Sequence, residues 1–179
     1  ATNYTFQLAS ICSNGDTVRA FEQVEYTTPM LAENIPYSCN FEQEADAQEW
    51  MLKNGNNTNK WHIGTPNNQT NGVLYISKDG GSSAEYNTSS TSIVVAEKLF
   101  DTGESDSLTI SFDLTIGGES TWDYLKVYWV DADTNYIAAT STSTYYADNS
   151  YATNILVSTH SSYPIINLLS GTQTLSVTI

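Results

Sequence analysis

Three closely spaced carboxylates are the residues with the clearest potential for catalysis. Glu44, Asp46 and Glu49 form the pattern Glu-x-Asp-x-x-Glu. Retaining hydrolysis of a glycosidic bond needs two carboxyl groups about 5 Å apart on a rigid support. The residues between the acids are two alanines and a glutamine, which favour a helix over a strand. We therefore expect an exposed turn or short helix here rather than an active site.

The histidines and cysteines give no recognisable site. His62 lies between two apolar residues, and His160 lies in a stretch rich in Thr and Ser. The chain has no Gly-x-Ser-x-Gly motif of a serine hydrolase. Neither histidine has a second His or Cys at the spacing that a zinc site requires. We expect neither histidine to be catalytic. Cys12 and Cys39 allow one disulfide at most, and two unpaired thiols are favoured over a bridge across the linker between them.

Tyrosine is unusually frequent, with twelve residues in the chain. Tyr145, Tyr146, Tyr151 and Tyr163 gather in a region rich in Thr, Ser and Asn. Tyrosine offers a large contact area with few torsions to freeze, which suits sugar stacking and protein recognition. Packing beneath loops is an equally good interpretation of the same four residues.

Composition excludes two classes of partner. Six basic and twenty acidic residues leave a net charge of −14, which argues against binding to nucleic acid or an anionic membrane surface. No apolar run approaches the roughly 18 residues of a membrane-spanning helix, so membrane insertion is not expected.

The elements that would position these residues are strands. Apolar and polar residues alternate from Leu108 to Ile116, which predicts a strand with one buried face, and Leu125, Val127 and Trp129 predict a second. The short run 93–96 fits a strand buried on both faces. The one helix candidate is 43–53, and residues 132–164 predict long loops with a strand or two. The pattern indicates an all-β sandwich.

The first 29 residues form a separate unit. Tyr4, Phe6 and Leu8 alternate with polar residues as in a half-buried strand, and Asn14-Gly15-Asp16 predicts a turn before a second strand over 21–28. Residues 30–36, which end at Pro36, are interpreted as a linker.

Short motifs over residues 39–128 occur in an order that resembles a known family. They are Cys39-Asn40-Phe41-Glu42, Trp61-His62-Ile63-Gly64, the stretch 74–81, the strand 108–116 and the segment 122–127. Together they resemble the MAM-like jelly roll of the bacterial cleaved-adhesin family. The resemblance implies a jelly-roll sandwich over 37–179 that lacks its last strands. Residues 1–29 resemble the C-terminal hairpin of a fibronectin type III domain, so we expect a fragment of a longer chain.

The resemblance implies a function without catalysis. We expect a secreted or cell-surface adhesion or binding module of a bacterial protein, with a glycan or a host or matrix protein as ligand and neighbouring domains of the same polypeptide as partners. The alternative is an accessory domain of a secreted protease or glycosidase. A third class is a glucanase, because Glu44, Asp46 and Glu49 are similar to the acidic motif of laminarinase-type jelly rolls.

A calcium site is expected at the start of the jelly roll. In an extended strand Asn40 and Glu42 would project to one side, and calcium takes six to eight oxygen ligands. The MAM-like and cleaved-adhesin families hold structural calcium with acidic residues of this motif, although Asn40 here replaces their usual Asp. Asp79 and Asp123 are weaker candidates, because Asp79 also fits a turn and Asp123 a strand cap.

Overall fold

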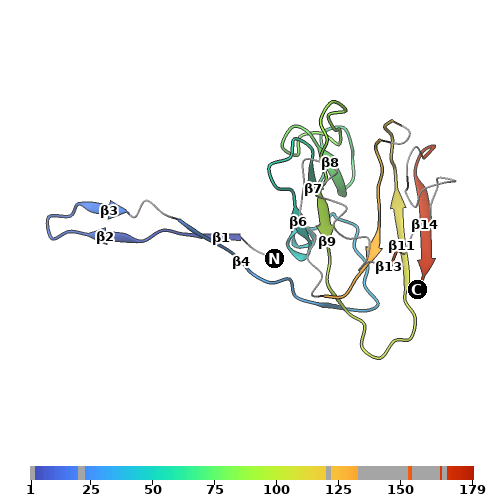
Figure 1. Ribbon diagram of the computed structural model, residues 1–179, viewed down its shortest axis with the longest axis horizontal. Coiled ribbons are helices and arrows are strands. Elements are labelled where there is room, and N and C mark those ends of the chain that lie inside the picture. The colour runs from blue at the N-terminus through green and yellow to red at the C-terminus, as the bar shows by residue number, and fades with distance from the viewer. Residues whose placement is uncertain (1–2, 20–22, 120–121, 133–152, 155–165, 167–168) are drawn as a thin grey trace.

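The computed structural model describes residues 3–19, 23–119, 122–132, 153–154, 166 and 169–179. Within these ranges the regular structure is almost entirely β-strand, and one helix of six residues is present. The predicted all-β class is therefore confirmed. The strands join as two-stranded pairs, antiparallel except for one. Figure 1 shows a body from which a long hairpin projects.

The projecting hairpin has two paired segments. β1 (Asn3–Phe6) pairs with β4 (Val24–Thr27), and further from the body β2 (Ala9–Ile11) pairs with β3 (Thr17–Arg19). The turn at the tip is the predicted one, and its glycine has a φ of 88°. The return strand starts at Thr17, earlier than the predicted residue 21.

The apolar side chains of this hairpin are not covered. Tyr4 lies opposite Tyr26 and Phe6 opposite Val24, so the four share one face. The predicted half-burial of the first strand is wrong: Tyr4, Phe6 and Leu8 are 48%, 58% and 79% exposed. A two-stranded hairpin has no second layer of its own to cover such a face. Among the described residues of the hairpin, which we also call the arm, the exposed large apolar side chains are Tyr4, Phe6, Leu8, Ile11, Val18, Val24 and Tyr26.

Part of the segment interpreted as a linker pairs with the body. β5 (Glu33–Asn34) runs parallel to β10 (Phe100–Asp101), and the Glu33 amide donates to the Leu99 carbonyl at 3.0 Å. The segment that follows the hairpin is therefore attached to the body through backbone hydrogen bonds.

The first half of the body holds the helix and two strand pairs. α1 (Glu44–Glu49) begins after Gln43 and ends before the predicted residue 53, because β6 (Met51–Lys53) follows at once. β6 pairs with β9 (Val95–Glu97). β9 overlaps the run 93–96, which was expected to be buried on both faces. Residues 93–96 are only half-buried, so that expectation is wrong. β7 (Lys60–Gly64) pairs with β8 (Val73–Ser77).

The second half of the body contains the clearest predicted strand. β11 (Thr109–Leu114) pairs along its length with β14 (Gln173–Thr178). Its even-numbered apolar residues are half-buried and its odd-numbered polar residues are exposed, which confirms the period-two prediction. On the exposed face, Thr109 bonds Thr178 at 3.0 Å and Asp113 accepts from Thr174 at 2.5 Å. Such polar cross-strand pairs suit a face turned to water.

A fifth strand pair completes the described body. β12 (Tyr128–Trp129) pairs with β13 (Thr153–Asn154), so the predicted strand through Leu125, Val127 and Trp129 forms only at its end. Leu125 instead makes an isolated bridge to Ile166. In the described part of the chain the buried apolar side chains are Tyr75, Ile166 and Leu175, which places the core beneath β8 and β14.

Candidate functional site

Two of the three acidic residues of the helix, Asp46 and Glu49, accept hydrogen bonds from other residues of the body. Glu44 is exposed, whereas Asp46 and Glu49 are half-buried. Asp46 accepts the backbone N–H of Gln43 at 3.2 Å, which satisfies a donor at the start of the helix. The segment is the short helix that the alanines predict.

Glu49 takes part in a cluster around a buried lysine. Its Oε2 accepts from the Tyr37 hydroxyl at 2.8 Å and from Lys98 Nζ at 3.2 Å. The Lys98 side chain is 2% exposed; it also pairs with Glu33 at 3.5 Å and lies 4.8 Å from the centre of the Tyr37 ring. A buried ammonium is tolerable only with such partners.

The electrostatics of this cluster differ from those of a glycosidase acid. The hydroxyl of Tyr37 is the main reason why the pKa of Glu49 is lowered from its ordinary value. The pKa of Tyr37 is raised, first by burial and then by its hydrogen bonds with Cys39 and Glu49. A catalytic general acid requires a raised carboxyl pKa, so Glu49 is shifted in the opposite direction.

The turn at residues 40–42 does not have the geometry expected for the calcium site. Phe41 has a φ of 60°, and Asn40 Oδ1 accepts the Glu42 N–H at 3.1 Å, so the segment is a turn. The expectation that Asn40 and Glu42 share a face of an extended strand is therefore wrong. Glu42 Oε1 accepts the Gly72 N–H at 2.9 Å, and a Cβ at Gly72 would collide with the Phe41 carbonyl.

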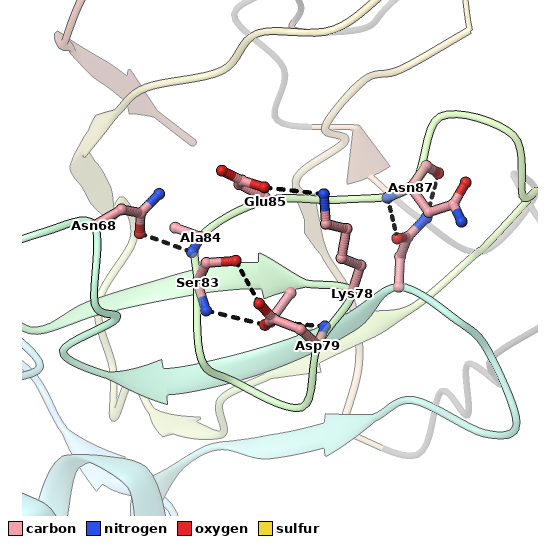
Figure 2. A network of polar contacts seen from close by, with 9 residues as sticks. Asn68, Lys78, Asp79, Ser83, Ala84, Glu85 and Asn87 are labelled. Atoms are coloured by element: carbon pink, nitrogen blue, oxygen red, sulfur yellow. Dashed lines mark hydrogen bonds and ion pairs between the residues drawn. The ribbon is translucent and has the colours of Figure 1, made fainter.

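Asp79 organises a loop of serines, shown in Figure 2. Its carboxylate accepts from Ser77 Oγ at 2.6 Å, from Ser83 Oγ at 2.7 Å and from Ser83 N at 3.0 Å. These bonds, that from Ser77 first, lower the pKa of Asp79. The loop is flanked by the exposed ion pair between Lys78 and Glu85 at 2.9 Å. The carboxylate thus closes a turn with most of its acceptor capacity in use.

Asp123 holds a second turn. Its Oδ2 accepts from Glu119 N at 2.8 Å and from the Tyr86 hydroxyl at 3.0 Å. Burial, followed by this hydrogen bond, raises the pKa of Tyr86 to about 12. Gly118 has a φ of 113°, and a Cβ there would collide with the Tyr86 hydroxyl. The packed turn carries Trp122, whose side chain is 78% exposed.

The candidate calcium ligands are not gathered at one point. Among the described residues, no group of three or more His, Cys, Asp and Glu side chains is close enough to hold a metal ion, and this includes Glu42, Asp79 and Asp123. Asn40 and Glu42 alone offer three side-chain oxygens where calcium takes six to eight oxygen ligands. A calcium ion bound at Asn40 and Glu42 would therefore need further oxygen ligands.

The remaining candidates divide between the described residues and the rest of the chain. His62 is half-buried, its ring 5.9 Å from that of Tyr75, and its Nε2 is buried without a hydrogen-bond partner. Cys12 and Cys39 are free, as predicted. The other candidates, which are Tyr145, Tyr146, Tyr151, Tyr163 and His160, lie outside the described residues.

Two asparagines that sequence reasoning missed secure the loops of this end of the body. Asn54 bonds both backbone groups of Trp61, at 2.7 and 3.0 Å, and Asn59 bonds both backbone groups of Asn87, at 2.6 and 3.0 Å. Each side-chain amide thereby satisfies a backbone N–H and a backbone carbonyl of its partner, as a neighbouring strand would do in a sheet. A sequence rich in asparagine and turn residues carries no signal that separates these two from the exposed ones.

Comparison of the chain with protein-family models, with curated proteins and with solved structures gives no match. No helix in the described ranges has the length and apolar character needed to cross a membrane. We therefore infer function from the residues and their contacts.

Proposed function

We propose that this chain is a non-catalytic adhesion or binding module of a secreted or cell-surface bacterial protein, with a glycan or a protein as its ligand. The observation that carries the proposal is the exposure of large aromatic and apolar side chains on the hairpin and on the turn at Trp122. Trp122 is 78% exposed, and the hairpin exposes Tyr4, Phe6 and Tyr26 by about half or more. Contiguous apolar surface of this kind typically marks an interaction site.

Trp122 is the residue best suited to a glycan. The Asp123 carboxylate and the crowding at Gly118 fix the turn that carries it, so little conformational freedom of the backbone is lost on binding. An indole face stacks on the apolar face of a sugar ring. The net charge of −14 favours a neutral sugar over a sulfated or sialylated one.

The hairpin face is better suited to a protein surface. Tyr4, Tyr26, Phe6 and Val24 lie on one side of the paired strands, while Thr5 and Glu25 occupy the other. A two-stranded hairpin with one apolar face is stable when a further β-layer covers that face. This supports the proposal that residues 1–29 are a fibronectin type III-like hairpin that packs on a neighbouring domain.

The proposed architecture for 37–179 is a MAM-like jelly roll of the cleaved-adhesin type. The antiparallel pairing of β11 with β14 and the single apolar face of β11 are what a sandwich layer requires. Structural calcium stays a proposal for the turn at Asn40 and Glu42, where further oxygen ligands would have to complete the shell.

The experiment that tests this function is a binding screen of the whole chain. The protein is applied to arrays of neutral and anionic glycans and of matrix proteins, together with Trp122→Ala and Tyr26→Ser. Leu31→Ala is the matched control, because Leu31 is 83% exposed but not aromatic. We expect saturable binding that Trp122→Ala removes for glycans or Tyr26→Ser removes for proteins. Absence of binding on every surface would contradict the proposal.

A further inference from the structure

Asparagine followed by glycine occurs three times in the chain, at Asn14-Gly15, Asn54-Gly55 and Asn71-Gly72. Glycine has no side chain to shield its nitrogen, and its backbone moves freely. Its amide nitrogen can therefore attack the preceding side-chain carbonyl carbon. The three sites share this local chemistry, so differences between them must come from the structure.

Two of the three sites are held by contacts with the body. Asn54 uses both polar atoms of its side-chain amide on the backbone of Trp61, at 2.7 and 3.0 Å. At the other site the Gly72 nitrogen, which would be the nucleophile, donates to Glu42 Oε1 at 2.9 Å. Gly72 is also buried, and it packs so closely on the Phe41 carbonyl that even a Cβ atom at Gly72 would collide with it. Reaction at either site requires part of the body to open.

Asn14 lies in a different setting. Residues 4–19 are all exposed, and the turn is closed only by local bonds, among them the Gly15 N–H to the Cys12 carbonyl at 2.9 Å. Opening this turn breaks no contact with the body, and exposed tips open at little free-energy cost. The Asp16 N–H donates to Asn14 Oδ1 at 3.1 Å, so it stabilises the negative charge that develops on that oxygen during attack.

We propose that Asn14 is a site of spontaneous covalent modification, deamidation through a cyclic imide, and that it is selected over Asn54 and Asn71 by its place at the hairpin tip. The deprotonated Gly15 nitrogen forms a bond to Asn14 Cγ. The bond from Cγ to Nδ2 breaks, and the NH2 group leaves as ammonia after taking up one proton from water. Water then hydrolyses either carbonyl of the ring, which gives aspartate or the β-linked isoaspartate.

The products change the hairpin where β2 and β3 meet. Asn14 Nδ2 now donates to Asp16 Oδ2 at 2.6 Å, and a carboxylate in its place would face Asp16 with like charge. The isoaspartate also inserts a methylene into the backbone of a turn that sets the register of both strands. Modification would therefore loosen the arm that exposes the apolar face.

The test is peptide mapping by mass spectrometry of the whole chain during incubation at neutral pH, in native buffer and in denaturant. In native buffer we expect Asn14 to deamidate at least about tenfold faster than Asn54 and Asn71, the factor that about 1.4 kcal/mol of extra opening free energy produces. In denaturant the three rates should converge to within about threefold, because the folded contacts are lost. Asn14→Gln should abolish the signal from the tip peptide.

Three results would overturn the proposal. In the first, Asn14 deamidates as slowly as the other two sites in native buffer, although all three react in denaturant. In the second, Asn54 or Asn71 deamidates in native buffer as fast as Asn14. In the third, the three deamidation rates differ in denaturant as much as they do in native buffer, which would assign the selectivity to the neighbouring sequence and not to the fold.

Discussion

At the scale of single residues, most polar side chains singled out by the sequence serve the fold around them. Asp79 closes a loop of serines, Asp123 closes the turn beneath Trp122, and Glu42 joins two loops through the Gly72 amide. Carboxylates that accept several hydrogen bonds are strongly held in the charged form, as the lowered pKa of Asp79 shows. A carboxylate that binds a metal ion and one that only accepts hydrogen bonds should respond differently to mutation in the presence of calcium.

The first prediction separates those roles for Glu42. Glu42→Ala removes the acceptor of the Gly72 N–H, so the melting temperature should fall in chelator as well as in calcium. If calcium also binds there, the fall should be larger in calcium. The measurement is a thermal melt of wild type and variant in both conditions, with Glu44→Ala on the exposed helix surface as control. A wild-type midpoint that does not respond to calcium would remove the metal role.

The second prediction concerns His62 and pH. Burial, followed by the nearby charge of Lys60, lowers the pKa of His62 below its ordinary value of 6.5, while Asp79 acts in the opposite direction. Between the folded-state pKa and 6.5 the unfolded chain binds more protons, so stability must fall as the pH falls through this window. His62→Gln should lose that part of the pH dependence, and His160→Gln should keep it. Parallel melting profiles for wild type and His62→Gln from about pH 7 to about pH 5 would contradict this assignment.

At the scale of elements, side-chain amides make hydrogen bonds to backbone groups that have no neighbouring strand. Asn59 is 6% exposed and pairs with both backbone groups of Asn87, which no strand accompanies. Asn57 and Asn59 are both buried in this part of the body. Buried amides with backbone partners fix loop positions as a hydrogen-bonded ladder fixes strands.

The third prediction tests this pairing. Asn59→Ala should lower the free energy of unfolding by about 2 kcal/mol, because the Asn87 N–H and carbonyl lose their partner. Asn56→Ala, at an exposed position three residues earlier, should change the free energy by less than about 0.5 kcal/mol. Chemical denaturation of the two variants makes the comparison, and equal effects would show that the paired amide is not special.

The elements differ in how far sequence could predict them. β11 was predictable because its period-two pattern is local, and α1 because its alanines favour a helix. The left-handed φ of Phe41 and the burial of Lys98 were not, because each depends on partners far along the chain, Gly72 and Glu49 among them. The position of the hairpin turn was predictable, but the exposure of the hairpin's apolar side chains was not, since their burial depends on whether another layer covers that face.

At the scale of the whole molecule, the segment that follows the hairpin is joined to the body by more than the covalent chain. β5 pairs with β10, and Lys98 pairs with Glu33 on β5 and with Glu49 on α1. The apolar hairpin precedes this contact in the chain and projects away from the body (Figure 1). The exposed apolar face of the hairpin supports a binding role, and Trp122 supplies a separate exposed aromatic surface on the body.

The central claim is binding without chemistry, and calorimetric titration with product analysis tests it most directly. The best ligand from the binding screen is titrated into the whole chain, and the ligand is recovered and analysed afterwards. We expect saturable heat, recovery of the ligand unchanged, and the same result for Glu44→Gln. Steady turnover of the ligand that Glu44→Gln abolishes would contradict the account and assign the chain to an enzyme class.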